Sequence, residues 1–112
     1  MLIYKILTRP EWDAFRAAGQ TRGAPIDLVD GYIHFSAAPQ LAETAARHFA
    51  NQSDLVLVAF DTTRLGDALK WEASRGGDLF PHLYRPLMLG EVVWDKSLPL
   101  GAAGHIFPEG VF

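Results

Sequence analysis

The sequence predicts a compact, single-domain α+β fold with a curved, mainly antiparallel or mixed sheet and two principal helices. Three observations lead to this prediction. The chain has 112 residues, close to the commonest domain size, and 49% of them are hydrophobic against 21% charged. The patterns run strand, helix, loop, strand, helix, strand and then several further strands. This order lacks the steady strand–helix alternation of a doubly wound parallel sheet.

The first part of the chain predicts a strand followed by a capped helix. Residues 2–7 are apolar apart from one lysine, as in a strand that is buried on at least one face. Thr8 and Glu11 have the spacing of a capping box, and Gly19 is a typical helix end. Residues 20–29 show no clear period. We expect a loop there, either a binding loop or a plain surface connection, whose apolar side chains pack back onto the core.

The middle of the chain contains its most informative stretch, residues 30–36 (Asp-Gly-Tyr-Ile-His-Phe-Ser). An Asp-Gly turn signal opens a short strand, and Ser36 or Ala38 then begins a second helix, with Pro39 in its first turn. Residues 55–60 form a nearly continuous apolar run, which predicts a central strand covered on both faces.

The last part of the chain predicts short strands and a tail. Residues 68–73 alternate weakly, and residues 80–84 contain a proline, which favours an extended segment at a sheet edge. Residues 87–89 and 92–95 predict one or two final strands. We place the whole chain, residues 1–112, in one domain, with residues 99–112 as an irregular tail rich in glycine and proline.

Charge and composition exclude several classes of function. A net charge of −3 and a pI near 5.7 argue against broad electrostatic binding of nucleic acid or an anionic membrane. The chain has no cysteine, which rules out disulfides, thiolate catalysis and cysteine-ligated zinc. Its apolar runs are too short to span a bilayer. We expect a cytoplasmic protein with a small-molecule ligand, no nucleic-acid partner and no membrane partner; the sequence does not define its oligomeric state.

Polar side chains at two strands predict a ligand site. On an alternating strand, His34 faces the same side as Tyr32 and Ser36, while Ile33 and Phe35 face the core. A histidine and a hydroxyl on one accessible wall suit a sugar, an amide or a phosphate. The alternative is a hydrogen-bonded structural histidine followed by a serine that only caps a helix.

The second stretch, predicted to form the opposite wall, contains three further candidates. His82 and Tyr84 share one strand face and could hold a base or an amide ring, or simply form the polar outer face of an edge strand. Glu72 could orient a ribose or act as a base, or be a solvated charge. A metal held by His34, His82 and Glu72 has no local motif to support it, so we predict no metal site.

The chain resembles a small bacterial and plant family known as domain of unknown function family 952. The matching pieces occur in order along the chain: Ile3-Tyr4-Lys5-Ile6, Trp12, residues 30–36, Trp71-Glu72 and Phe80-Pro81-His82-Leu83-Tyr84. The resemblance implies a fold similar to the ADP-ribosyltransferase-like superfamily, with a split antiparallel sheet that grips NAD as a substrate. It implies that His34 and Ser36 contact the ribose or amide, that Tyr84 or His82 stacks on the nicotinamide, and that Glu72 promotes transfer.

Three functional hypotheses follow. The first is a cleft that binds NAD or an ADP-ribose-like nucleotide, with His34 and Glu72 as catalytic residues if transfer occurs. The second is a non-catalytic module that binds a small metabolite or a peptide in the same cleft. The third is a small hydrolase or isomerase with His34 paired to Glu72 or His82 as acid and base. No cofactor is firmly indicated, and NAD enters only as the substrate that the first hypothesis requires.

Overall fold

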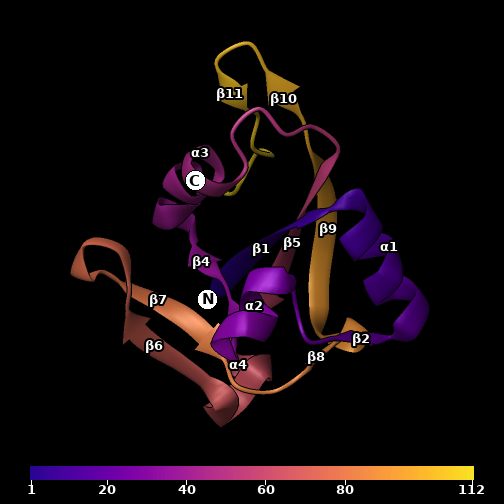
Figure 1. The fold of residues 1–112 in the computed structure, drawn as a ribbon, viewed down its shortest axis with the longest axis vertical. Helices are drawn as coiled ribbons and strands as arrows, with labels where there is room; N and C mark the ends of the chain where they lie inside the picture. Colours follow the sequence, from indigo (N-terminus) through magenta and orange to yellow (C-terminus); the bar gives the residue numbers. More distant parts are fainter.

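The protein folds into two main antiparallel sheets with short helices around them (Figure 1). The computed structural model describes residues 1–112, apart from the side chain of Arg75. The larger sheet has the strand order β4-β1-β5-β9, formed by Ser36–Ala37, Leu2–Thr8, Leu55–Asp61 and Val92–Leu98. The second has the order β3-β7-β6, formed by Ile33–His34, Leu79–Leu83 and Leu69–Ala73. Two short pairs complete the set: β2 (Gln20–Thr21) with β8 (Leu87–Met88), and β10 (Leu100–Gly101) with β11 (Gly104–His105).

The single-domain α+β prediction is therefore confirmed in outline, and the described strand pairs are all antiparallel. The prediction of one curved sheet is wrong, because the strands divide between two main sheets and two short strand pairs. The α-helices are α1 (Arg9–Ala18), α2 (Pro25–Asp30), α3 (Leu41–His48) and α4 (Thr62–Leu65), and single 3₁₀ turns lie at Ala38–Gln40, Gly66–Ala68, Arg75–Gly77 and Leu89–Glu91. None of the described helices is long and apolar enough to cross a membrane.

The predicted start and end of α1 are confirmed by its capping contacts. The Thr8 hydroxyl accepts a hydrogen bond from the Glu11 backbone N–H, and the Glu11 carboxylate accepts one from the Thr8 N–H. These two bonds satisfy N–H groups that a helix start leaves without partners. Gly19 ends the helix with a φ of 77°, which glycine adopts without strain.

The core lies on both faces of strand β5, as the continuous apolar run predicts. One face, with Val56, Val58 and Phe60, packs against α1 and the second sheet. The other face, with Leu55 and Leu57, packs against α3 and the end of the chain. Pairing with β1 on one side and β9 on the other places β5 inside the sheet. This rigid layer supports the strands that carry the candidate site.

The prediction of an irregular loop at residues 20–29 is wrong. The segment contains strand β2 and helix α2, and its apolar side chains Ile26, Leu28 and Val29 are exposed rather than packed on the core. The side chain of this segment that enters the interior is the carboxylate of Asp27. A helix of six residues is too short for a periodic sequence signal.

Strand β7 lies between β3 and β6, so the predicted edge position of residues 80–84 is also wrong. Pro81 is tolerated there because β3 pairs only through Ile33 with Leu83 and through His34 with His82. The ladder ends just before Pro81, whose carbonyl still accepts a hydrogen bond from the Phe35 N–H. The missing N–H of the proline thus falls where no ladder bond is required.

The end of the chain is more ordered than an irregular tail. Residues 100–105 form the β10–β11 hairpin with a turn at residues 102–103, and Gly104, which begins β11, has a φ of 123°. Beyond it, Val111 is buried in the cluster that covers α3, and the rings of Phe107 and Phe112 lie 5.2 Å apart. Burial of these apolar side chains fixes the segment against the core.

Candidate functional site

The two candidate stretches form one wall rather than two opposite walls. Strands β3 and β7 are neighbours in the second sheet, and His34 pairs directly with His82. Their rings lie 5.2 Å apart at 70°. Side chains at paired positions of an antiparallel ladder point to the same face of the sheet. The structure therefore brings the two predicted histidines together.

His34 is held between two carboxylates. Its Nδ1 lies 2.5 Å from Oδ1 of Asp27, and its Nε2 lies 2.9 Å from Oδ2 of Asp30. The Asp27 side chain is fully buried, whereas 35% of the Asp30 side chain is exposed. Both ring nitrogens donate to these carboxylates when the imidazole carries two protons. The buried contact fixes the ring orientation, and the exposed contact faces the solvent side of the site.

Asp27 connects helix α2 to strands β1 and β3. Its Oδ2 accepts hydrogen bonds from the Ala24 N–H at 2.7 Å and from Nζ of Lys5 at 2.8 Å. Its Oδ1 also accepts one from the His34 N–H at 3.0 Å. Lys5 donates further to the His34 carbonyl at 2.8 Å. Lys5 and Asp27 thus form a buried ion pair in which each charge has additional hydrogen-bond partners, as buried charges require.

The pKa of Asp27 reflects two opposing effects. Burial raises the pKa of the carboxyl, since the charged form loses hydration. The hydrogen bonds from His34 and the charge and hydrogen bond of Lys5 outweigh burial and lower the pKa from 3.8 to about 2. Asp27 is therefore ionised at neutral pH and acts as a fixed negative charge behind His34.

Local sequence explains why α2 presents Asp27 inward. Pro25 occupies the first turn, where no backbone donor is needed, and Asp27 caps the helix start through the Ala24 N–H. Gly23 precedes the helix with a φ of 99°, and a Cβ atom at this position would overlap the Asp27 side chain. Glycine at residue 23 is thus required both by its backbone conformation and by the close approach of the carboxylate.

A second carboxylate–histidine pair stands beside the first. Oε1 of Glu72 lies 2.8 Å from Nδ1 of His82 and accepts a hydrogen bond from the Tyr84 hydroxyl at 2.7 Å. The hydrogen bonds from Tyr84 and His82 lower the pKa of Glu72. The same bond to Glu72 raises the pKa of Tyr84 to about 12. Glu72 therefore positions His82 and Tyr84. No direct contact joins it to His34 among the described residues, which leaves His82 as the other partner that the acid–base hypothesis named for His34.

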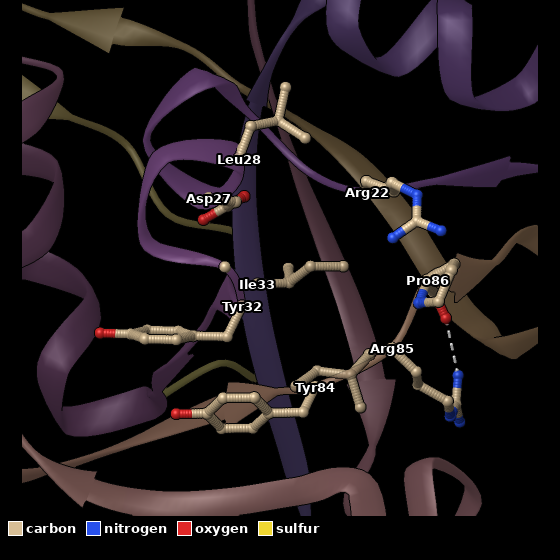
Figure 2. Close-up of a pocket in the computed structure, with 10 residues that line it drawn as sticks. Arg22, Asp27, Leu28, Tyr32, Ile33, Tyr84, Arg85 and Pro86 are labelled. Carbon is tan, nitrogen blue, oxygen red and sulfur yellow. Dashed lines mark hydrogen bonds between the residues drawn. The ribbon is translucent and has the colours of Figure 1, made fainter.

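Tyr32 joins the two pairs. Its ring stacks on His82 with centroids 4.3 Å apart at 28°, and it lies 4.7 Å from the His34 ring and 5.1 Å from the Tyr84 ring. Figure 2 shows Tyr32 and Tyr84 side by side with their hydroxyls pointing the same way. His82 is 3% exposed, and its Nε2 is buried with no hydrogen-bond partner among the described residues.

A cleft of about 670 Å³ opens next to this wall. His34, Ser36 and His82 line it, together with Asp30 at its rim and Arg47 on α3. Its volume lies within the range of small-molecule sites, about 300–1,000 Å³. The remaining lining mixes hydroxyls, charges and apolar rings: Tyr4, Lys5, Ile6, Thr8, Glu11, Ala24, Pro25, Ile26, Asp27, Phe35, Thr44, His48, Phe49, Ser74 and Phe80.

Asp27 also lines a smaller pocket of about 160 Å³ (Figure 2). Arg22 and Arg85 line it. Arg85 bonds to the Glu91 carboxylate at 2.6 Å and to the Leu65 carbonyl at 3.0 Å, so its guanidinium is already engaged. The pocket is too small for a nucleotide. The larger cleft is the better candidate site.

Only some of the residues predicted for the site line the cleft. His34, Ser36 and His82 line the cleft, and the Ser36 hydroxyl lies 3.0 Å from that of Thr44. Tyr84 lines the smaller pocket, and Glu72 lines neither. Among the described side chains, no group of three or more histidine, aspartate or glutamate residues is arranged to hold a metal ion.

Sequence reasoning missed Lys5, Asp27 and Arg47. A lysine inside an otherwise apolar strand is a signal of a buried ion pair, because such a charge needs a partner. The Pro-x-Asp spacing of Pro25 and Asp27 is a signal of a helix start. Arg47 carried no distinguishing signal, since it occupies an exposed position of an ordinary amphipathic helix.

The fold and the cleft together define a small α+β protein with paired histidines on a cleft wall. A family model described as "Protein of unknown function (DUF952)" matches residues 6–95. The chain therefore belongs to the DUF952 family, which confirms the family part of the resemblance.

Solved structures of one protein, CC0527 from Caulobacter crescentus, are similar to this chain. Its crystal structure is 55% identical, covers 94% of this chain and 92% of its own, and superposes with a TM-score of 0.90. Its solution NMR structure is 56% identical, covers 93% and 90%, and has a TM-score of 0.84. No curated protein matches the chain. These relatives support the fold and carry no statement of activity.

Proposed function

We propose that the protein binds a nucleotide of the NAD or ADP-ribose class in the cleft of about 670 Å³. The observation that carries the proposal is the placement of His34 and His82 as paired residues on the wall of a cleft of ligand size. The ADP-ribosyltransferase-like resemblance supports the same class of ligand. The two separate antiparallel sheets are compatible with the split sheet that this resemblance implies.

The chemistry of the lining suits each part of such a nucleotide. Asp30 and Ser36 can hydrogen-bond ribose hydroxyls beside His34, since a carboxylate accepts and a serine both donates and accepts. Phe35, Phe49 and Phe80 in the lining of the cleft can contact a planar ring. Arg47 pairs with Glu43 through an exposed contact of 3.1 Å. A phosphate can replace Glu43, because exposed ion pairs are weak.

The proposal is binding, with transfer of ADP-ribose as a further step that Glu72 would have to support. Glu72 lies outside the cleft lining and shares its Oε1 between His82 and Tyr84. A carboxylate that stabilises a cationic ribose must face it directly. Transferase activity therefore requires Glu72 to leave these partners, whereas binding does not.

The experiment is a thermal-shift titration with NAD, ADP-ribose and nicotinamide. A ligand that binds only the folded state raises the melting temperature by mass action. We expect NAD and ADP-ribose to raise it for the natural protein and less for Arg47→Gln. Arg16→Gln, which removes an exposed arginine on α1 outside the cleft, is the matched control. No shift with any of the three ligands, or equal shifts for both variants, contradicts the proposal.

A second candidate function is acid–base catalysis by His34, favoured by its 2.5 Å contact with the buried Asp27 carboxylate. Such a contact orients an imidazole for proton transfer through its other nitrogen, which must first release Asp30 at 2.9 Å. The assay is chromatographic detection of products after incubation with NAD or ADP-ribose. Turnover that disappears in His34→Gln supports catalysis, and binding without turnover leaves a non-catalytic binding module.

A further inference from the structure

His82 is a buried histidine whose two nitrogens have different surroundings. Its Nδ1 lies 2.8 Å from the Glu72 carboxylate. Its Nε2 is buried and has no hydrogen-bond partner among the described residues. Buried polar atoms in proteins are nearly always hydrogen-bonded, and exceptions call for a specific explanation. Because His82 lines the cleft, a bound molecule that displaces the side chains covering Nε2 can supply the partner that the rest of the chain does not.

The contacts of Glu72 decide which nitrogen carries the proton. Oε1 of Glu72 accepts from the Tyr84 hydroxyl at 2.7 Å as well as from His82. The hydrogen bonds from both partners lower the pKa of Glu72, so it is an ionised carboxylate with no proton to give. His82 must therefore donate through Nδ1–H. In the neutral ring, the other nitrogen, Nε2, then has a lone pair and can only accept.

Neighbouring rings hold the imidazole in this orientation. Tyr32 stacks on one side at 4.3 Å, and the His34 ring approaches at 5.2 Å and 70°. The backbone of His82 is held from both sides, because it pairs with Lys70 on β6 and with His34 on β3. The acceptor is thus pre-organised, which reduces the ordering cost of binding.

We infer that His82 determines specificity by accepting a hydrogen bond at Nε2 from an N–H of the bound nucleotide, which we assign to the carboxamide of its nicotinamide ring. This inference rests on the proposed function, and it adds which partner donates and which accepts in one hydrogen bond between the protein and the nucleotide. A ligand that places only an oxygen acceptor there leaves two lone pairs facing each other. A site built around a hydrogen bond rejects analogues that lack the donor.

The test compares two dinucleotides that differ in one group. NAD carries a carboxamide, and 3-acetylpyridine adenine dinucleotide carries a neutral ketone in which a methyl group replaces the NH₂. Calorimetry with the full chain should give a preference for NAD of about tenfold or more, since loss of a hydrogen-bonded donor in a built site has at least this effect. Equal affinities overturn the inference and leave the proposed function standing. Absence of binding by both dinucleotides overturns both.

Two variants separate the role of the tautomer from general damage to the wall. In Glu72→Gln the amide can either donate to or accept from Nδ1, so the tautomer is no longer fixed and the preference for NAD should shrink. Tyr84→Phe removes the other hydrogen bond to Glu72 and leaves Nδ1 paired, so the preference should persist. The inference is contradicted if Tyr84→Phe reduces the preference for NAD over the ketone analogue and Glu72→Gln does not.

Nitrogen-15 NMR of the imidazole provides a readout without ligand. In its neutral form, the ring of His82 in the natural protein should carry its proton on Nδ1 and show an unprotonated Nε2. Addition of NAD should shift the Nε2 resonance, whereas the ketone analogue should not. A proton on Nε2 in the free protein would overturn the inference whatever the dinucleotides do.

Discussion

Replacement of Asp27 by asparagine is the perturbation whose effect the structure predicts most directly. The substitution keeps the size of the side chain and removes its charge. It leaves Lys5, which is 7% exposed, without the carboxylate 2.8 Å from its Nζ. It also removes the charge next to the His34 ring. We expect Asp27→Asn to destabilise the protein at neutral pH.

The magnitude follows from the pKa of Asp27. A fall from 3.8 to about 2 means that the ionised form stabilises the folded state by about 2 kcal/mol. Removal of one member of a buried ion pair costs about 3–5 kcal/mol, because the remaining charge is uncompensated. The expected loss in free energy of unfolding is therefore about 2–4 kcal/mol. The lower end of this range applies if the asparagine side-chain oxygen keeps some of the hydrogen bonds that Asp27 accepts.

The pH dependence has a defined sign. The pKa of Asp27 is lower in the folded than in the unfolded chain, so the unfolded chain takes up the proton first as pH falls. The stabilisation is complete above about pH 4–5 and is lost as pH falls towards 2. The difference between the natural protein and Asp27→Asn should narrow over this interval.

Urea denaturation at pH 7 and at several acidic pH values measures both effects. Asp30→Asn is the matched control, because Asp30 contacts the same imidazole from a side chain that is 35% exposed. It should cost less than about 1 kcal/mol. Equal effects of the two substitutions, or a difference that stays constant between pH 7 and pH 2, would refute the reasoning.

Three further predictions concern single contacts. Glu72→Gln should lower the pKa of Tyr84 from about 12 towards 10, because the carboxylate that opposes phenol ionisation is lost; NMR titration of the labelled tyrosines measures this, and an unchanged value contradicts it. Gly23→Ala should destabilise the protein more than Gly31→Ala in urea denaturation, since both have positive φ but only the Gly23 Cβ would meet Asp27; equal losses contradict this. Thr8→Ala should cost about 1 kcal/mol by removal of the α1 cap, and no loss of stability would show that the cap is dispensable.

Sequence patterns predicted the elements whose signals are local and long. Helix α1 has ten residues with a cap at each end, and strand β5 has seven residues, of which Leu55 to Phe60 are buried. Helix α2 was missed because its position depends on Asp27, whose partners Lys5 and His34 lie far away in the sequence or on another strand. Such tertiary contacts leave no periodic signal.

Strand order was the second limit of prediction. Pro81 favoured an edge strand, and the rule fails here only because β3 ends before it reaches the proline. That short neighbour cannot be read from the residues of β7 itself. The pairing of β3 with β7 also places the two stretches, which were expected to face each other, on one wall. The functional role of His34, Ser36 and His82 stays a prediction.

The contacts also change which histidine deserves the first experiment. From the sequence, His34 leads, because it lies in the most distinctive stretch. In the structure both nitrogens of His34 already contact carboxylates, Asp27 on one side and Asp30 on the other. His82 lines the cleft and has one carboxylate on Nδ1, while its buried Nε2 has no partner among the described residues. A ligand must compete with Asp30 to reach His34, whereas at His82 it supplies a missing hydrogen bond, so variants of Glu72 and His82 should change selectivity more than variants of Asp30 do.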